Sequence, residues 1–455
     1  MTTPAEIMPS AQRSIIVRRV VISAVITLLI LSPALEGVFQ IDRFAQAGLT
    51  TAAVFIVVMI ALGIKPPLAS RAQSVMIAIV TVTLTVAVID LIGRSALADT
   101  LNVRPENRII VRWTRLPSIP RLMPNIEYDR VVSGDLSNYA LSPEDHDPRR
   151  VRFITDEYGF RNTPPIPDKI DTIDLGDSYG MGSGTSQEAT LTADLQASGR
   201  SVYNLSIGGS SPWQEYVNFA AEADRLKLSP GSVVLWLLFT GNDLGGNYGR
   251  TQLDSLPWED PFGEWLVSVQ TFRAQSPLRQ IAQRIEAQQD VTRGDNVVSY
   301  PFINGKQMLF KSRMEDALTL EQVLAHRHYP SLVSTIQAMT QFTRDRSLQL
   351  AIIVIPTKNE VYRWVMAGDK PWSSDPTPAG FGQAVQQIAL DQKVCFIDLK
   401  SALIKESERA YEDSGETLWW YDDAHWNSVG QAFTASLLRE RLCLDAASGK
   451  FCCQP

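Results

Sequence analysis

A serine follows an apolar run in the stretch "IDLGDSYGMGSG", which spans Ile173 to Gly184. A serine hydroxyl is a poor nucleophile until a base removes its proton, so a reactive Ser178 needs a histidine elsewhere in the chain. The chain has 4 histidines, and one of them, His425, lies in "YDDAHWNSVG" behind two adjacent aspartates. Taken alone, Gly-Asp-Ser also fits a tight loop without chemistry, and His425 also fits a surface histidine. The two stretches together favour an activated serine.

An aspartate would complete this pair by holding the other ring nitrogen of His425. Such a contact fixes the tautomer and stabilises the imidazolium that forms during attack. Asp422 precedes the histidine by three residues, a spacing that a turn can close. The closer spacing of Asp423 suits this role less in a loop. We therefore favour Asp422 as the orienting carboxylate, with Asp423 as its competitor.

Donors for the negative charge of a tetrahedral intermediate occur in two further stretches. "NLSIGGSS" contains Gly209, and "FTGND" places Asn242 after an apolar run. The amides of Ser178 and Gly209 and the side-chain nitrogen of Asn242 would supply three donors, each worth about 3–4 kcal/mol of barrier. The alternative role for Asn242 and Asp243 is to cap a helix.

Strands must bring these distant stretches together. From about residue 151, apolar and β-branched runs alternate with helix-like segments. This alternation predicts an α/β fold with a doubly wound parallel sheet, in which ligands bind beyond the carboxyl ends of the strands. Ser178, Gly209 and Asn242 each follow such a run, and His425 precedes the final predicted helix. We therefore expect one rim of the sheet to hold all four residues.

Taken jointly, the motifs resemble a known family. The SGNH (GDSL-type) hydrolases have four sequence blocks, which this chain matches with "GDS" at Gly176 to Ser178, Gly209 in "NLSIGG", "GND" at Gly241 to Asp243 and "DDAH" at Asp422 to His425. The resemblance covers about 150–442. It implies a flavodoxin-like SGNH domain with Ser178 as nucleophile, His425 as base, Asp422 as orienter, and Gly209 and Asn242 in the oxyanion hole. Neither a metal nor a cofactor is expected.

Other details refine this resemblance. "DEYGFRN" and "IPTKNEVY" look like segments of bacterial exported members, including those that O-acetylate polysaccharides. Tyr179 stands where the family usually has Leu or Phe, and Ser211 stands where a second glycine is often found. The second departure leaves the oxyanion amide open. We interpret the glycines behind Ser178 as clearing room around an exposed nucleophile.

The first hundred residues differ from the rest in hydrophobicity. Three segments, Val20 to Phe39, Ala47 to Ile64 and Val75 to Ile92, are each near the ~20 apolar residues that a helix needs to cross a bilayer. We predict a membrane anchor of three transmembrane helices over 1–93, because "LSPALEGVFQ" lacks the cleavage site of a signal peptide. Basic residues before the first segment and between the second and third place the N-terminus in the cytoplasm.

The predicted order is therefore the anchor, a connector over 94–150, and an extracytoplasmic domain over 151–455 with an insertion around 245–325. The predicted location is a bacterial inner membrane, with several crossings and the catalytic domain in the periplasm. The 4 cysteines all lie in the exported part. Cys443 is expected to pair with Cys452 or Cys453, and Cys395 with the other.

Charge excludes one class of partner. The chain has 49 acidic and 42 basic side chains and no basic block, so nucleic-acid binding is not expected. We expect a membrane-anchored serine esterase or O-acyltransferase that acts on acylated glycans. Its expected partners are the lipid bilayer, an acylated polysaccharide, and a membrane acyltransferase or assembly protein. A non-catalytic glycan-binding or assembly subunit and a lipid esterase are the alternatives. Hydrolysis and transfer share one acyl-enzyme, so both stay open.

Overall fold

The computed structural model describes residues 89–90, 106–112, 119–139, 147–246, 278, 297–301, 306–311, 318–367, 375–443 and 451–454. The chain divides into two compact units. One comprises 1–101 and 265–282, and its described part holds a hydrogen bond from the amide of Leu278 to Asp90 at 3.4 Å. The other comprises 102–264 and 283–455 and contains the sheet and every predicted site residue.

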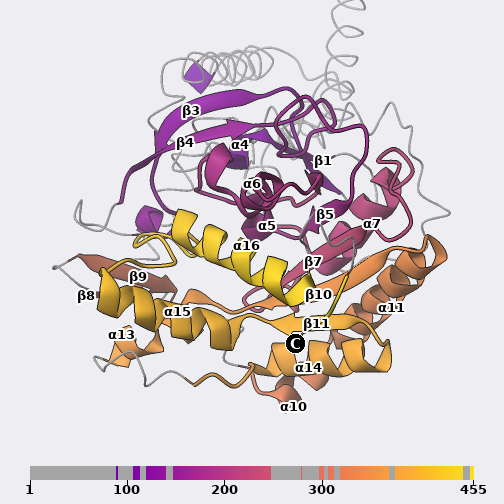
Figure 1. Cartoon of the computed structure of the whole chain (residues 1–455). Helices are drawn as coiled ribbons and strands as arrows, with labels where there is room; N and C mark the ends of the chain where they lie inside the picture. The colour runs from indigo at the N-terminus through magenta and orange to yellow at the C-terminus, as the bar shows by residue number, and fades with distance from the viewer. Residues whose placement is uncertain are drawn as a thin grey trace, which may run out of the picture. The chain divides into compact units, whose positions relative to one another are not determined.

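A five-stranded parallel sheet forms the centre of the second unit (Figure 1). The strands, in spatial order, are β11 (Cys395–Asp398), β10 (Gln349–Ile355), β7 (Val233–Phe239), β5 (Thr172–Leu175) and β6 (Val202–Asn204). Read in chain order this is the 2-1-3-4-5 arrangement of flavodoxin-like folds. The central strand β7, "VVLWLLF", is buried at every position, as a strand covered on both faces must be.

Helices cover both faces of the sheet, and each face has its own apolar core. One core contains Trp213, Ile336 and Phe381 from α7 (Pro212–Glu222), α11 (Tyr329–Asp345) and α14 (Gly380–Asp391). The other contains Leu191, Leu403 and Leu438 from α6 (Leu191–Ala197), α15 (Lys400–Asp413) and α16 (Ser428–Leu442). Successive β10 residues alternate between the two cores, because side chains on a strand alternate between faces.

Shorter elements surround this sandwich. They are α4 (Glu106–Ile109), β1 (Ile110–Arg112), β2 (Pro120–Leu122), β3 (Glu127–Val132), η1 (Leu136–Tyr139), β4 (Arg149–Ile154), α5 (Ser178–Met181), η3 (Gln187–Ala189), α10 (Leu320–Leu324), α12 (Lys358–Val361) and α13 (Arg363–Ala367). Strands β3 and β4 pair antiparallel. This pair joins the predicted connector to the sheet domain, since β4 crosses the predicted boundary at residue 150.

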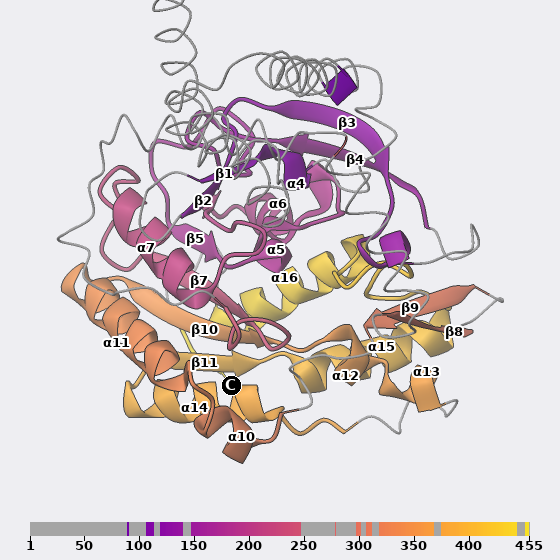
Figure 2. The same ribbon diagram turned by 180° about the vertical axis from the view of Figure 1, so that it is seen from behind.

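The described part of the predicted insertion around 245–325 includes a further antiparallel pair, β8 (Val297–Pro301) and β9 (Gln307–Lys311). Strand β9 contacts α12, and β8 contacts α13. The pair lies at the same end of the domain as α13 and α15 (Figure 2). Strand β9 also contacts the loop that contains His425, because the amide of Leu309 donates to the carbonyl of Tyr421 at 2.9 Å.

The prediction of three N-terminal transmembrane helices is corrected. No helix among the described residues is long and apolar enough to cross a membrane. The longest of them, α11, has 17 residues and buries one face, whereas a spanning helix needs ~20 predominantly apolar residues. The segments Val20 to Phe39 and Ala47 to Ile64 lie outside the described residues, as does Val75 to Ile92 except for Ile89 and Asp90. Only the α/β part of the predicted fold class is supported.

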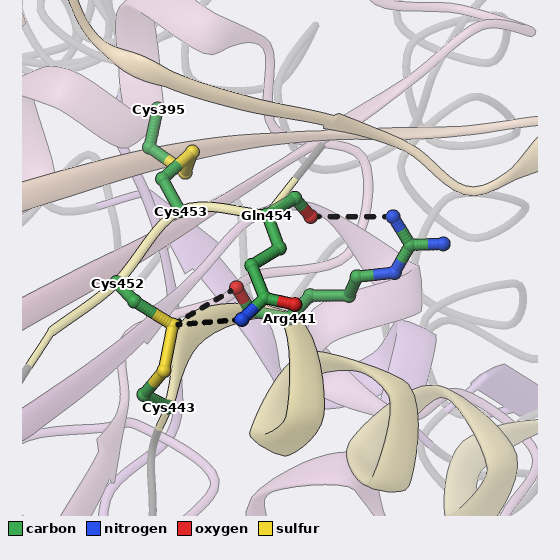
Figure 3. Close-up of a disulfide and its surroundings, with 6 residues drawn as sticks. All are labelled: Cys395, Arg441, Cys443, Cys452, Cys453 and Gln454. Atoms are coloured by element: carbon green, nitrogen blue, oxygen red, sulfur yellow. Dashed lines mark hydrogen bonds between the residues drawn. A yellow bond between two sulfur atoms is a disulfide. The ribbon is translucent and has the colours of Figure 1, made fainter.

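Two disulfides fix the C-terminal tail (Figure 3). Cys443 pairs with Cys452, and Cys395 pairs with Cys453, which is one of the two arrangements that the sequence leaves open. Cys443 directly follows α16, and Cys395 begins the edge strand β11. The tail is therefore bonded both to the last helix and to the edge of the sheet.

Replacing Cys395 and Cys453 together by serine should destabilise the domain more than replacing Cys443 and Cys452. The first pair closes 58 residues and the second only 9. Loop-closure entropy then predicts losses of about 4 and about 3 kcal/mol in the free energy of unfolding. Urea unfolding without reductant measures both losses, and the reverse order would refute the expectation.

Candidate active site

Three loops that follow parallel strands meet around Ser178. Ser178 begins α5 directly after β5, and the Asp177 carboxylate caps this short helix by accepting from the amide of Tyr179 at 2.9 Å. The loop after β6 is bonded to the same place, because Ser210 Oγ donates to the carbonyl of Gly176 at 3.2 Å. Asn242, after β7, donates from Nδ2 to the Asp177 carboxylate at 3.4 Å. The predicted rim therefore exists.

His425 connects the serine to a carboxylate. Its Nε2 lies 2.6 Å from Ser178 Oγ, and its Nδ1 lies 2.8 Å from Asp423 Oδ1. Asp423 is fully buried and His425 is 8 % exposed, whereas Ser178 is partly exposed. A proton can thus pass from the hydroxyl to the imidazole while the carboxylate holds the ring.

The partner of His425 is Asp423, not the predicted Asp422. The Asp423 carboxylate accepts from the His425 amide at 2.9 Å, as aspartates do two residues ahead in a turn. This turn brings the carboxylate to the imidazole, so the closer spacing is the suitable one. Asp422 instead accepts from the amides of Gly134 and Asp147 at 2.7 and 3.0 Å. It therefore attaches the histidine loop to the segment around β3 and β4.

Arg149, which lies outside the four sequence blocks, bridges both aspartates. Its Nη1 lies 2.6 Å from Asp422 Oδ1, and its Nη2 lies 2.6 Å from Asp423 Oδ2. The side chain is 8 % exposed. A signal for it exists in the sequence: on β4, Arg149 alternates with exposed Arg150 and shares its face with the buried Val151.

A second buried cation, Lys358, lies on the other side of the same loop. It opens α12 within "IPTKNEVY", and its Nζ donates to the carbonyls of Trp420, Tyr421 and Asp423 at 2.7, 3.0 and 3.0 Å. These three acceptors use all three protons of the ammonium. Burial lowers the pKa of Lys358 to about 7, although the nearby carboxylates oppose this.

Tyr179, which stands where the SGNH hydrolases that the chain resembles usually have Leu or Phe, bonds to the histidine loop. Its hydroxyl donates to the carbonyl of Ala424 at 2.5 Å and accepts from Trp419 Nε1 at 3.2 Å. Its ring centroid lies 4.9 Å from that of His425. Leu or Phe could not make these hydrogen bonds, so the tyrosine joins the nucleophile loop to the histidine loop.

The glycines behind Ser178 have another purpose than the sequence suggests. A Cβ on Gly180 would lie 2.3 Å from Ser206 Oγ, and one on Gly184 would lie 2.9 Å from Arg149 Nη2. Gly182 and Gly184 also have φ near +75°, at +75° and +72°, which favours glycine. These residues are buried. They permit close packing beneath the nucleophile and do not clear space above it.

The motif "DEYGFRN" contributes an arginine that bonds to the backbone of the loop after Ser178. Arg161 is buried, and its guanidinium donates to the carbonyls of Met181, Gly182 and Thr185 at 3.0, 2.7 and 2.7 Å. Burial lowers the pKa of Arg161 to about 10. The segment "DEYGFRN" therefore contains a residue, Arg161, that holds the backbone of the turn after Ser178.

The predicted oxyanion donors lie on the open side. Gly209 is exposed, has a φ of +75°, and has no heavy atom within 4 Å of where its Cβ would stand. Asn242 is also exposed, and its Nδ2 reaches the neighbour of the nucleophile. Backbone can thus approach a substrate at Gly209 without a side chain in the way.

Three side chains around His425 lie close enough together to bind a metal ion. Among the residues that the structure describes, Asp135, Asp423 and His425 have ligand atoms within 4.8 Å of one another. Asp135 Oδ2 lies 3.8 Å from His425 Nδ1, and Asp135 Oδ1 accepts from the amide of Ala424 at 2.9 Å. A cation bound to Nδ1 would displace the hydrogen bond between His425 and Asp423, so the two uses exclude each other.

Comparison with models of protein families and with curated proteins finds no match to this chain.

Lys358→Met should change how stability depends on pH. The pKa of Lys358 is about 7 in the fold and ~10.4 in an unfolded chain, so the unfolded state binds more protons between these values. The wild type should then gain up to about 1.4 kcal/mol of unfolding free energy per pH unit over Lys358→Met from about pH 7 to about pH 10, and nothing below. Urea unfolding across this range tests it. The exposed Lys405→Met is the control, and a pH-independent difference for Lys358→Met would refute the expectation.

Proposed function

We propose that the chain is a serine esterase or O-acyltransferase that forms an acyl-enzyme on Ser178. The observation that supports this best is the continuous contact from Ser178 Oγ through His425 to Asp423, at 2.6 and 2.8 Å. Such a constellation serves acyl transfer on unrelated folds, and it is recognised by geometry and roles.

The proposed reaction has two halves. Ser178 Oγ attacks the carbonyl carbon of an ester while His425 Nε2 takes the hydroxyl proton. The tetrahedral intermediate expels the alcohol, which receives that proton, and the acyl group stays on Oγ. Water or a sugar hydroxyl then attacks the acyl carbon, again losing its proton to Nε2. The acyl group leaves on the acceptor, and the proton returns to Ser178.

The charge on the carbonyl oxygen needs donors in the intermediate. In the proposal these are the amides of Ser178 and Gly209 and Nδ2 of Asn242, from the three loops that meet at the rim. The open space beside Gly209 favours this assignment. Each donor lowers the barrier by about 3–4 kcal/mol.

An acylated glycan outside the cytoplasm is the proposed substrate. The four blocks and the two further segments that resemble SGNH members, including those that O-acetylate polysaccharides, support the substrate class. The two disulfides support an oxidising compartment, since such bonds persist outside the cytosol.

The deciding experiment offers the protein an acetyl-ester donor, with and without oligosaccharides, and identifies the products by mass spectrometry. Acetate alone would indicate an esterase, and acetylated oligosaccharide a transferase. A serine-directed phosphonate should label Ser178 in the wild type. Ser178→Ala should abolish both labelling and turnover while it leaves the free energy of unfolding nearly unchanged, and Ser201→Ala, before β6, serves as the control. Turnover by a folded Ser178→Ala variant would end the proposal.

The two aspartates should differ sharply in this assay. Asp423→Asn removes the carboxylate that fixes the His425 tautomer, which typically lowers kcat by about 10⁴-fold in such sites. Asp422→Asn leaves the contact at 2.8 Å between His425 and Asp423 intact, so its loss in kcat should be far smaller. Steady-state kinetics on one ester compares them, and an equal or larger loss for Asp422→Asn would contradict the assignment.

A further inference from the structure

We propose that Arg149 is a positioning residue that aligns Asp423 with His425 for catalysis, an inference that rests on the proposed function. Arg149 lies outside the four SGNH-like blocks, at the start of β4. Its link to His425 runs through Asp423, which contacts both side chains.

The two oxygens of the Asp423 carboxylate have separate partners. Oδ1 accepts from Nδ1 and from the amide of His425, at 2.8 and 2.9 Å. Oδ2 accepts from Arg149 Nη2 at 2.6 Å. With both oxygens held, the carboxylate plane cannot rotate away from the imidazole. Removing Arg149 would take this contact away from Oδ2.

Charge gives a second reason for an arginine here. Asp422 and Asp423 are adjacent and both fully buried, so their repulsion is poorly screened. The planar guanidinium fork reaches one carboxylate with each terminal nitrogen, at 2.6 Å in both cases. A lysine is a point charge and cannot bridge two carboxylates in this way.

The guanidinium is itself fixed by neutral groups. Nε donates to the carbonyl of Gly184 at 3.2 Å, Nη1 also donates to the carbonyl of Asp147 at 3.0 Å, and Cζ lies 4.3 Å from the ring centroid of Trp420. Gly184 belongs to the loop behind the nucleophile. Arg149 therefore connects the loop of Ser178 with the loop of His425, and it is held rigidly enough to orient a carboxylate.

Loss of this orientation should slow the chemical step and leave substrate binding unchanged. Misplacement of a catalytic group by about 1 Å can cost on the order of 100-fold. Arg149→Gln should therefore lower kcat by about that factor with little change in KM. Arg150→Gln is the matched control, because its neighbouring guanidinium is 74 % exposed and pairs with Asp129 on the surface.

A double-mutant cycle separates positioning from a general structural role. If Arg149 acts through Asp423, then adding Arg149→Gln to Asp423→Asn should change kcat by less than about threefold, because residues that act as a unit are not additive. Additive losses, or an unaffected Arg149→Gln variant, would overturn the inference. Should Arg149→Gln fail to fold, Arg149→Lys keeps the charge without the bridge, and the same cycle applies to it.

A spectroscopic measurement keeps this inference separate from the proposed function. The Nδ1 proton of His425 in its hydrogen bond to Asp423 should give a low-field NMR resonance, identified by its absence in His425→Ala. Arg149→Gln should shift or broaden that resonance, and Arg150→Gln should not. A shift in an inactive protein would support the positioning role while the proposed function fails. An unchanged resonance would refute the role whatever the activity.

Discussion

Two adjacent buried carboxylates constrain the whole site. Asp422 and Asp423 are fully buried, and a charge taken out of water is tolerated only when it is paired and hydrogen-bonded. The carboxylates are bonded to the amides of Gly134 and Asp147 and to the guanidinium of Arg149, all far away along the chain. Lys358, from a third region, donates to main-chain carbonyls of the same loop. The histidine loop has its shape because these segments converge on it.

This convergence is needed because the parallel sheet alone does not bring His425 to Ser178. Parallel strands bring Ser178 and Asn242 to one edge, but His425 comes from a loop outside the sheet. That loop is held by Lys358 after β10, by Tyr179 beside the nucleophile, and by Arg149 on β4. Such a polar network fixes one geometry only when every member is satisfied.

The sequence predicts the fold of the sheet domain and the pairing of Ser178 with His425, because strand runs and turn residues are local signals. Spacing along the chain favours Asp422 over Asp423, because spacing does not reveal the turn that points the Asp423 side chain at the imidazole. The sequence does not indicate the role of Arg149, because the two aspartates that it contacts lie 273 and 274 positions away along the chain. The glycines were noticed, but what packs against Gly180 depends on Ser206 from another loop. Contacts between residues that are far apart along the chain depend on the folded structure and cannot be read from local sequence.

The separation of Ser178 and His425 along the chain has a consequence during synthesis. Ser178 and His425 are 247 positions apart. At ~5–20 residues per second, a ribosome needs on the order of ten to fifty seconds to travel between them. Throughout that interval the nascent chain carries Ser178 and Arg149 without the loop that contacts both side chains in the folded domain. The contact that runs from Ser178 through His425 to Asp423 therefore cannot form until 423–425 have been synthesised, after every strand of the five-stranded sheet.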